Sequence, residues 1–318
     1  MATDPTAAFG ATNCPLITPF EDSTANGEGS GGERGGEREG IDTDALASLV
    51  EVLIDRGLDG LVPCGTTGEF ASLTEKEYRT VIETTAGAAG DRAPVMAGAA
   101  TTTVETTLDR LEAAAESGAD AGLVTLPYFH GANVPEGEAR FFRAIAAETP
   151  LPVYLYNIPG CVGREVPLET VAAVAEEEAI VGCKDSSGDF EYFLEVDRHT
   201  PAEFRLFQGY DSYFVPGLAA GSAGGINALA NAIPESFVAA SQAVRAEKYE
   251  RAREIQATEI APLFELCLAH GFAPASKAAA AARGFLPDTA VRPPLVDLDR
   301  ETRAEIDETV ASVATNYE

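Results

Sequence analysis

Short apolar runs alternate with longer amphipathic segments along most of the 318-residue chain. The runs are bounded by turn residues and read as buried strands, whereas the longer segments repeat apolar residues at helical spacing. The pattern predicts strands at 11–17, 58–63, 94–97, 121–125, 152–156, 180–184, 204–207 and 224–228. It predicts a helix after each strand, at 41–57, 74–89, 103–117, 136–147, 167–177, 189–198, 211–219 and 234–246.

Strands that alternate with helices pair in parallel, and eight such units at this length indicate a closed (β/α)8 barrel, or TIM barrel. We expect the barrel to occupy residues 1–246. Residues 247–318 should form a C-terminal helical extension, with helices near 249–269, 273–283 and 299–314. Residues 21–40 are rich in Gly and Glu and almost devoid of apolar side chains, so we expect a disordered surface insertion there.

Charge adds a further constraint, because 51 acidic residues against 22 basic ones leave a formal net charge of −29. Such a surface repels nucleic acid and anionic membranes, so neither is an expected partner. The acidic residues are scattered along the predicted helices and lysines are scarce. This pattern is expected of a halophilic protein whose self-repulsion is screened by concentrated salt.

The cysteines are odd in number and widely spaced, without a CxxC pair, and several lie in apolar strands. Buried thiols in a reducing cytosol are therefore favoured over disulfides or a zinc site. The N-terminus lacks the basic and apolar segments of a signal peptide, and no apolar run reaches the length of about 18 residues that spans a membrane. We expect a cytoplasmic protein. The cysteines are Cys14, Cys64, Cys161, Cys183 and Cys267.

Active sites of such barrels lie at the C-terminal ends of the strands. Lys184 ends the sixth predicted strand and is followed by turn residues. A desolvated lysine can serve as a nucleophilic amine near neutral pH. By itself, however, a lysine that ends a strand is more often a solvated residue or the partner of a carboxylate.

Two further strand ends carry polar groups. Glycines flank Thr66 and Thr67 in a GTTGE turn after the second strand, which can bring backbone amides to a bound anion or form a structural turn alone. Tyr156 begins a YNIPG segment at the end of the fifth strand. It can shuttle a proton or cap the core as an amphipathic aromatic. Dispersed histidines and the lack of nucleophile-elbow, Walker and GxGxxG motifs disfavour zinc, Ser-His-Asp and nucleotide chemistry.

The combination of GTTGE, YNIPG and a lysine ending the sixth strand resembles the dihydrodipicolinate synthase and N-acetylneuraminate lyase family of class I aldolases, over roughly residues 11–300. The resemblance implies a Schiff-base enzyme without metal or organic cofactor, in which Lys184 forms an imine with a keto acid. Tyr156 would relay protons, and Thr66 would be the hydroxyl through which it works. The family also implies a homotetramer made of two dimers. The implied substrate-binding positions are Gly65, Thr67, Tyr128, Gly225 and Ile226.

Two departures from the family pattern bear on the substrate. Dihydrodipicolinate synthases usually carry an arginine for the second substrate's carboxylate two residues after the motif's proline, where Cys161 stands here, and Phe129 replaces a relay tyrosine. A neutral thiol cannot make a bidentate contact, although Arg164 can serve from a shifted position. We therefore expect an enzyme similar to archaeal 2-keto-3-deoxygluconate aldolases. It would cleave 2-keto-3-deoxygluconate or its 6-phosphate to pyruvate and glyceraldehyde or its phosphate.

Several alternatives stay open. Within the family these are 4-hydroxy-tetrahydrodipicolinate synthase, which condenses pyruvate with aspartate semialdehyde, and a keto-acid dehydratase that uses the same imine. A catalytically silent metabolite sensor or scaffold has no need for the amine of Lys184. A phosphate-binding isomerase would need a carboxylate base, and Glu69, the only obvious candidate, is better suited to capping. The expected partners are a small keto acid and an aldehyde.

Overall fold

Eight parallel strands form one sheet in the computed structural model, which describes residues 9–21, 40–129 and 134–317. The order around the sheet is β2-β1-β8-β7-β6-β5-β4-β3, and a parallel bridge between Leu61 and Val95 joins β2 to β3. The predicted TIM barrel is confirmed. The strands are β1 (Thr12–Cys14), β2 (Gly60–Leu61), β3 (Met96–Gly98), β4 (Ala121–Thr125), β5 (Val153–Asn157), β6 (Ile180–Asp185), β7 (Arg205–Gln208) and β8 (Gly224–Ile226).

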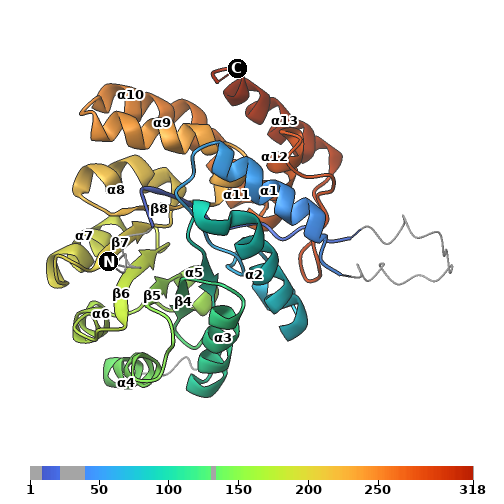
Figure 1. The fold of residues 1–318 in the computed structure, drawn as a ribbon. Coiled ribbons are helices and arrows are strands. Elements are labelled where there is room, and N and C mark those ends of the chain that lie inside the picture. Colours follow the sequence, from blue (N-terminus) through green and yellow to red (C-terminus); the bar gives the residue numbers. More distant parts are fainter. Residues whose placement is uncertain (1–8, 22–39, 130–133, 318) are drawn as a thin grey trace.

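Helices cover the outside of the barrel, as Figure 1 shows. A capping box starts the second helix: the Thr74 hydroxyl accepts a hydrogen bond from the Glu77 amide, and the Glu77 carboxylate accepts one from the Thr74 amide. The helices that follow the strands are α1 (Thr43–Asp55), α2 (Glu75–Ala89), α3 (Val104–Glu116), α4 (Pro135–Ala146), α6 (Leu168–Val174), α7 (Phe190–His199), α8 (Phe214–Ala220) and α9 (Pro234–Arg245). The sequence pattern missed α5 (Pro159–Val162), which is too short to show a period.

Aromatic side chains fill the interior of the barrel. Tyr154 on β5 makes edge-on contacts with Phe9 and Phe207, with ring centroids 6.0 and 5.7 Å apart. Its ring fits because its register neighbour on β6 is Gly182, where a Cβ would meet the Arg205 carbonyl at 2.2 Å and the Tyr154 ring at 2.7 Å. The filled interior leaves space for a ligand only above it, at the strand ends.

Residues 249–314 form the helices α10 (Tyr249–Ile255), α11 (Ala261–His270), α12 (Phe272–Ala282) and α13 (Arg300–Ala314), with a π-helical turn at Gln256–Ile260. One hydrophobic core joins α1, α2 and α9 to α11, α12 and α13. The division into a barrel and an extension at residue 246 stays a prediction. Most of the predicted insertion, residues 22–39, lies outside the described residues.

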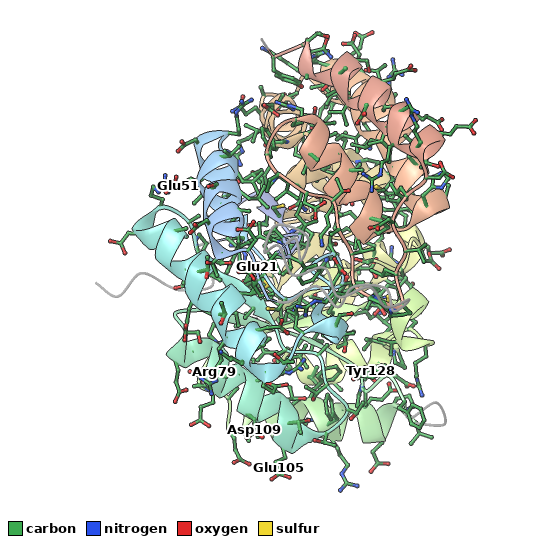
Figure 2. All side chains as sticks on the ribbon, turned by 90° about the vertical axis from the view of Figure 1, so that its right-hand side faces the viewer. Glu21, Glu51, Arg79, Glu105, Asp109 and Tyr128 are labelled. Carbon is green, nitrogen blue, oxygen red and sulfur yellow. The ribbon has the colours of Figure 1, made fainter. Side chains whose placement is uncertain are left out.

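Acidic side chains stand on the outer faces of the helices. Glu51 on α1 and Glu105 and Asp109 on α3 are exposed and point away from the barrel (Figure 2). Within the described part of the chain, no helix is both long and apolar enough to cross a membrane.

Candidate active site

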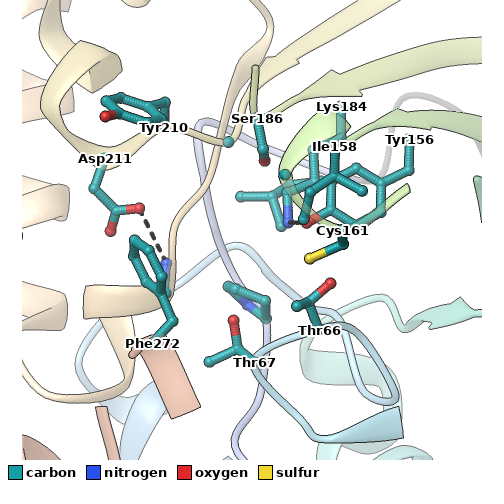
Figure 3. A pocket seen from close by; sticks show the side chains of 15 residues that line it. Thr66, Thr67, Tyr156, Ile158, Cys161, Lys184, Ser186, Tyr210, Asp211 and Phe272 are labelled. Carbon is teal, nitrogen blue, oxygen red and sulfur yellow. Dashed lines mark hydrogen bonds between the residues drawn. The ribbon is translucent and has the colours of Figure 1, made fainter. Parts of the chain in front are cut away.

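A cavity of about 280 Å³ opens at the C-terminal ends of the strands (Figure 3). Five residues predicted as site residues line it together, although they come from four different strand ends. The cavity is mostly apolar with a few polar groups, which is the usual character of a small-molecule site. The five residues are Thr66, Thr67, Tyr156, Lys184 and Ile226.

Lys184 and Tyr156 form the centre of this cavity. They are register partners on β6 and β5, and paired residues of parallel strands point to the same side of the sheet. The Lys184 Nζ lies 3.3 Å from the Tyr156 hydroxyl and 4.3 Å from the centre of its ring. Both residues are buried: Lys184 is 4% exposed and Tyr156 is 6% exposed. A proton can therefore pass directly between the amine and the phenol.

The GTTGE turn brings Thr66 and Thr67 to the cavity from β2. The turn closes with hydrogen bonds from the Gly68 amide to the Gly65 carbonyl and from the Glu69 amide to the Thr66 carbonyl, both 3.1 Å. Gly68 is required by packing, because a Cβ there would lie 2.7 Å from the Leu16 carbonyl. Gly65, predicted as a substrate-binding residue, does not line the cavity, but its carbonyl accepts the hydrogen bond that closes the turn.

Two other predicted substrate-binding residues lie away from the cavity. Tyr128 is 48% exposed and does not line it. Gly225 on β8 is packed closely against side chains, since a Cβ there would meet the Asn227 side chain at 1.9 Å and the Phe214 ring at 2.6 Å. Its neighbour Ile226 is the β8 residue that faces the cavity.

The cavity residues without a role assigned from the sequence include Tyr210, Asp211 and Phe272. Burial raises the pKa of Asp211 to about 6, against hydrogen bonds from Leu229 and Asn227 and the charge of Lys184. Tyr210 and Asp211 could have been found from the sequence, because they follow the seventh predicted strand at its C-terminal end. Phe272 had none, because it comes from α12, outside the eight predicted units.

The side of the cavity near α5 is lined by uncharged residues. Burial raises the pKa of the Cys161 thiol, while the charge of Lys184 and a hydrogen bond from Thr66 act in the opposite direction. Arg164 does not line the cavity; its guanidinium forms an ion pair with the buried carboxylate of Glu138 on α4. Among the described lining residues, Lys184 is the only cation, and the Ser186 hydroxyl is buried without a hydrogen-bond partner.

The chain is similar to the members of one family of known proteins. The profile of the Dihydrodipicolinate synthetase family matches residues 36–313. The chain is 37% identical over 250 residues to a 4-hydroxy-tetrahydrodipicolinate synthase of Natronomonas pharaonis, covering 78% of this chain and 79% of that protein. It is 35% identical to the Methanopyrus kandleri enzyme of the same name, covering 91% of each. The crystal structure of dihydrodipicolinate synthase from Thermotoga maritima superposes with a TM-score of 0.87 at 26% identity, covering 96% of this chain and 99% of that one.

These relatives correct the expected activity. We expected a 2-keto-3-deoxygluconate aldolase because Cys161 and Phe129 replace an arginine and a tyrosine. Most of the relatives compared are named 4-hydroxy-tetrahydrodipicolinate synthase, among them four at 33–37% identity, so the expectation of a sugar-acid aldolase is wrong. The physical reason is that only one of the two departures lines the cavity: Cys161 does, whereas Phe129 is 86% exposed and does not.

The family also decides between an enzyme and a silent sensor or scaffold. Its members are enzymes of the pyruvate-dependent class I aldolase and lyase type, which confirms that prediction. The matched profile spans most of the chain, and the relatives named above exceed 30% identity over more than two thirds of it. The chain therefore belongs to the dihydrodipicolinate synthetase family.

Proposed function

We propose that this enzyme is a 4-hydroxy-tetrahydrodipicolinate synthase, which condenses pyruvate with aspartate semialdehyde. The observation that carries the proposal is the buried pair of Lys184 and Tyr156, 3.3 Å apart, at the mouth of a barrel similar to those of synthases with this name. The pair supplies a nucleophilic amine and a proton carrier, which an imine mechanism needs together.

The first half of the reaction uses pyruvate alone. After the Lys184 ammonium gives up a proton, its amine adds to the keto carbon, and water leaves as the imine forms. The imine withdraws electrons, so the methyl carbon loses a proton and becomes an enamine carbon. The Tyr156 hydroxyl, 3.3 Å from the amine, takes and returns the protons of these steps. We assign Thr66 to the proton path and Thr67 to the pyruvate carboxylate.

In the second half, the enamine carbon forms a bond to the aldehyde carbon, whose oxygen becomes a hydroxyl after protonation. Water or the amino group of the second substrate then displaces Lys184 from the imine carbon. Ile226 and Phe272 provide apolar walls around the reacting carbons. The unpartnered hydroxyl of Ser186 is available to the polar end of the aldehyde substrate.

A second candidate within the family is a keto-acid dehydratase that uses the same imine. It is favoured by one observation: apart from Lys184, no described lining residue is cationic, and Arg164 is engaged by Glu138. A dehydratase acts on one keto acid and needs no cation for a second carboxylate.

The experiment that separates the two candidates supplies wild-type enzyme in concentrated salt with pyruvate and aspartate semialdehyde, and separately with a hydroxylated 2-keto acid. Mass spectrometry follows the substrates and products. The proposal predicts joint consumption of pyruvate and semialdehyde, and no consumption by Lys184→Ala. Loss of water from the hydroxy acid, without condensation, would contradict it in favour of the dehydratase.

We further propose that the enzyme works in the cytoplasm, in concentrated salt and as a homotetramer. The five cysteines are free thiols, which suits a reducing compartment. The net charge of −29 suits high salt, where screening shortens the range of self-repulsion. The melting temperature should then fall as salt is removed, and size-exclusion chromatography in high salt should give four subunits.

A further inference from the structure

The GTTGE turn is bounded by two residues in an uncommon backbone conformation. Cys64, directly before it, has φ of 57°, and Glu69, its last residue, has φ of 55°. Residues other than glycine adopt this left-handed region rarely, and keep it where their surroundings hold them in place. The turn between them carries Thr66 and Thr67 into the cavity, so whatever holds Glu69 also determines where these hydroxyls lie.

A buried ion pair holds Glu69. Its carboxylate accepts a hydrogen bond from the ammonium of Lys277, and both side chains are fully buried. Its second oxygen accepts from the Arg292 amide at 2.9 Å. Lys277 also donates to the Ala290 carbonyl at 2.6 Å and lies 4.1 Å from the centre of the Phe20 ring. Since an unpartnered buried charge is strongly unfavourable, each member of the pair fixes the other.

Lys277 belongs to α12, the helix whose first residue, Phe272, lines the cavity. One helix therefore contacts the cavity at its start and holds the turn from its middle. Neither Lys277 nor Glu69 lines the cavity, so neither contacts a ligand there. A buried pair is weak evidence for stability, and its best-supported use is to select one arrangement of the groups around it.

We propose that Lys277 is a positioning residue for pyruvate binding: through Glu69 it holds the GTTGE turn so that Thr67 meets the pyruvate carboxylate and Thr66 stays in the proton path. The inference rests on the proposed function in one respect, namely that pyruvate binds at Lys184. This role of Lys277 would make the C-terminal helices part of the substrate site. Because the pair is buried, concentrated salt screens it little.

The test titrates pyruvate against the fraction of enzyme that borohydride traps as an adduct, measured by mass spectrometry of the intact protein in concentrated salt. Lys277→Met should raise the half-saturating pyruvate concentration about 10-fold or more. Its trapped fraction at saturating pyruvate should stay near that of the wild type. A merely structural residue would lower the melting temperature without this shift.

A matched control comes from the end of the same helix. Arg283 follows α12 and forms an ion pair with Glu235 at 2.8 Å, with side chains 10% and 12% exposed. Arg283→Met removes a partly buried ion pair that does not contact the turn. Its half-saturating concentration should stay within about twofold of the wild type, whatever its melting temperature.

A second variant covers the case in which Lys277→Met fails to fold. Glu69→Gln/Lys277→Met removes both charges, so no unpaired charge is buried, yet it should still bind pyruvate weakly because the ionic constraint on the turn is gone. Lys277→Arg should recover part of the affinity.

Half-saturation of the folded variants at the wild-type pyruvate concentration would overturn this inference alone. A wild-type enzyme that traps no pyruvate would overturn the imine mechanism as well.

Discussion

Register determines the chemistry at the scale of single residues. Tyr156 and Lys184 occupy paired positions on neighbouring strands, so their side chains project from the same side of the sheet. A shift of one residue in either strand would turn one of them away from the cavity. The 3.3 Å contact between amine and phenol is thus a consequence of strand pairing and needs no flexible loop.

Tyr156→Phe tests the acid–base role of this contact. The substitution removes the hydroxyl and keeps the ring beside Lys184, so folding should change little. We expect kcat to fall by about 10²-fold or more, the usual effect of losing a positioned proton carrier. Tyr249→Phe, at a tyrosine of α10 that is 53% exposed, is the control and should keep wild-type activity. Wild-type turnover by Tyr156→Phe would remove Tyr156 from the mechanism.

At the scale of secondary-structure elements, contacts at the ends of helices hold the site in place. The start of α2 is tied to the C-terminal region by Arg292, whose guanidinium pairs with Glu77 and also donates to the Ser72 carbonyl at 2.9 Å. Glu77 belongs to the capping box of α2 as well. The helix that follows the GTTGE turn is therefore held at its first turn by residues more than 200 positions away in sequence, since Glu77 and Arg292 are separated by 215 positions.

Glu77→Gln tests this link through its pH dependence. The Arg292 guanidinium, opposed by partial burial and assisted by bonds from Thr74, lowers the pKa of Glu77 to about 2. A carboxyl with a lowered pKa stabilises the fold above its unfolded pKa of about 4.5, and this contribution is lost as pH falls toward 2. Glu77→Gln should therefore reduce the free energy of unfolding at pH 7 by about 1–3 kcal/mol.

The difference between Glu77→Gln and wild type should shrink as pH falls from about 4.5 to about 2, measured by urea unfolding at constant salt. Glu75→Gln on the same helix is the control. Glu75 pairs with Arg110 but is 70% exposed, so its loss should cost about 1 kcal/mol or less. A Glu77→Gln difference that does not depend on pH would contradict the link.

Most elements could be predicted from periodicity, and β4 even has the predicted bounds. Lys184, Tyr156, Thr66 and Thr67 were predictable because strand ends and their turns are visible in the pattern. The short helix α5 was not, since its four residues are too few for a helical period. Lys277 lies in an alanine-rich stretch, and its partner is 208 positions away, so no local pattern indicates the pair.

At the scale of the whole molecule, the site depends on more than the barrel. Phe272 in the cavity wall and Lys277 behind the GTTGE turn both come from the helices after the eighth strand. The same core cluster extends from α1 and α2 into those helices. We therefore expect substrate binding to depend on the C-terminal helices. The eight β/α units alone would not show this dependence.

The measurement that tests the central claim most directly is borohydride reduction of the enzyme with pyruvate in concentrated salt, followed by peptide mass spectrometry. The account predicts a reduced pyruvate adduct on the peptide that carries Lys184, and none on Lys184→Ala. It also predicts that the other buried lysine, Lys277, stays unmodified, because it is fully buried and paired with Glu69. Absence of an adduct in the wild type, or an adduct that persists in Lys184→Ala, would contradict the imine mechanism.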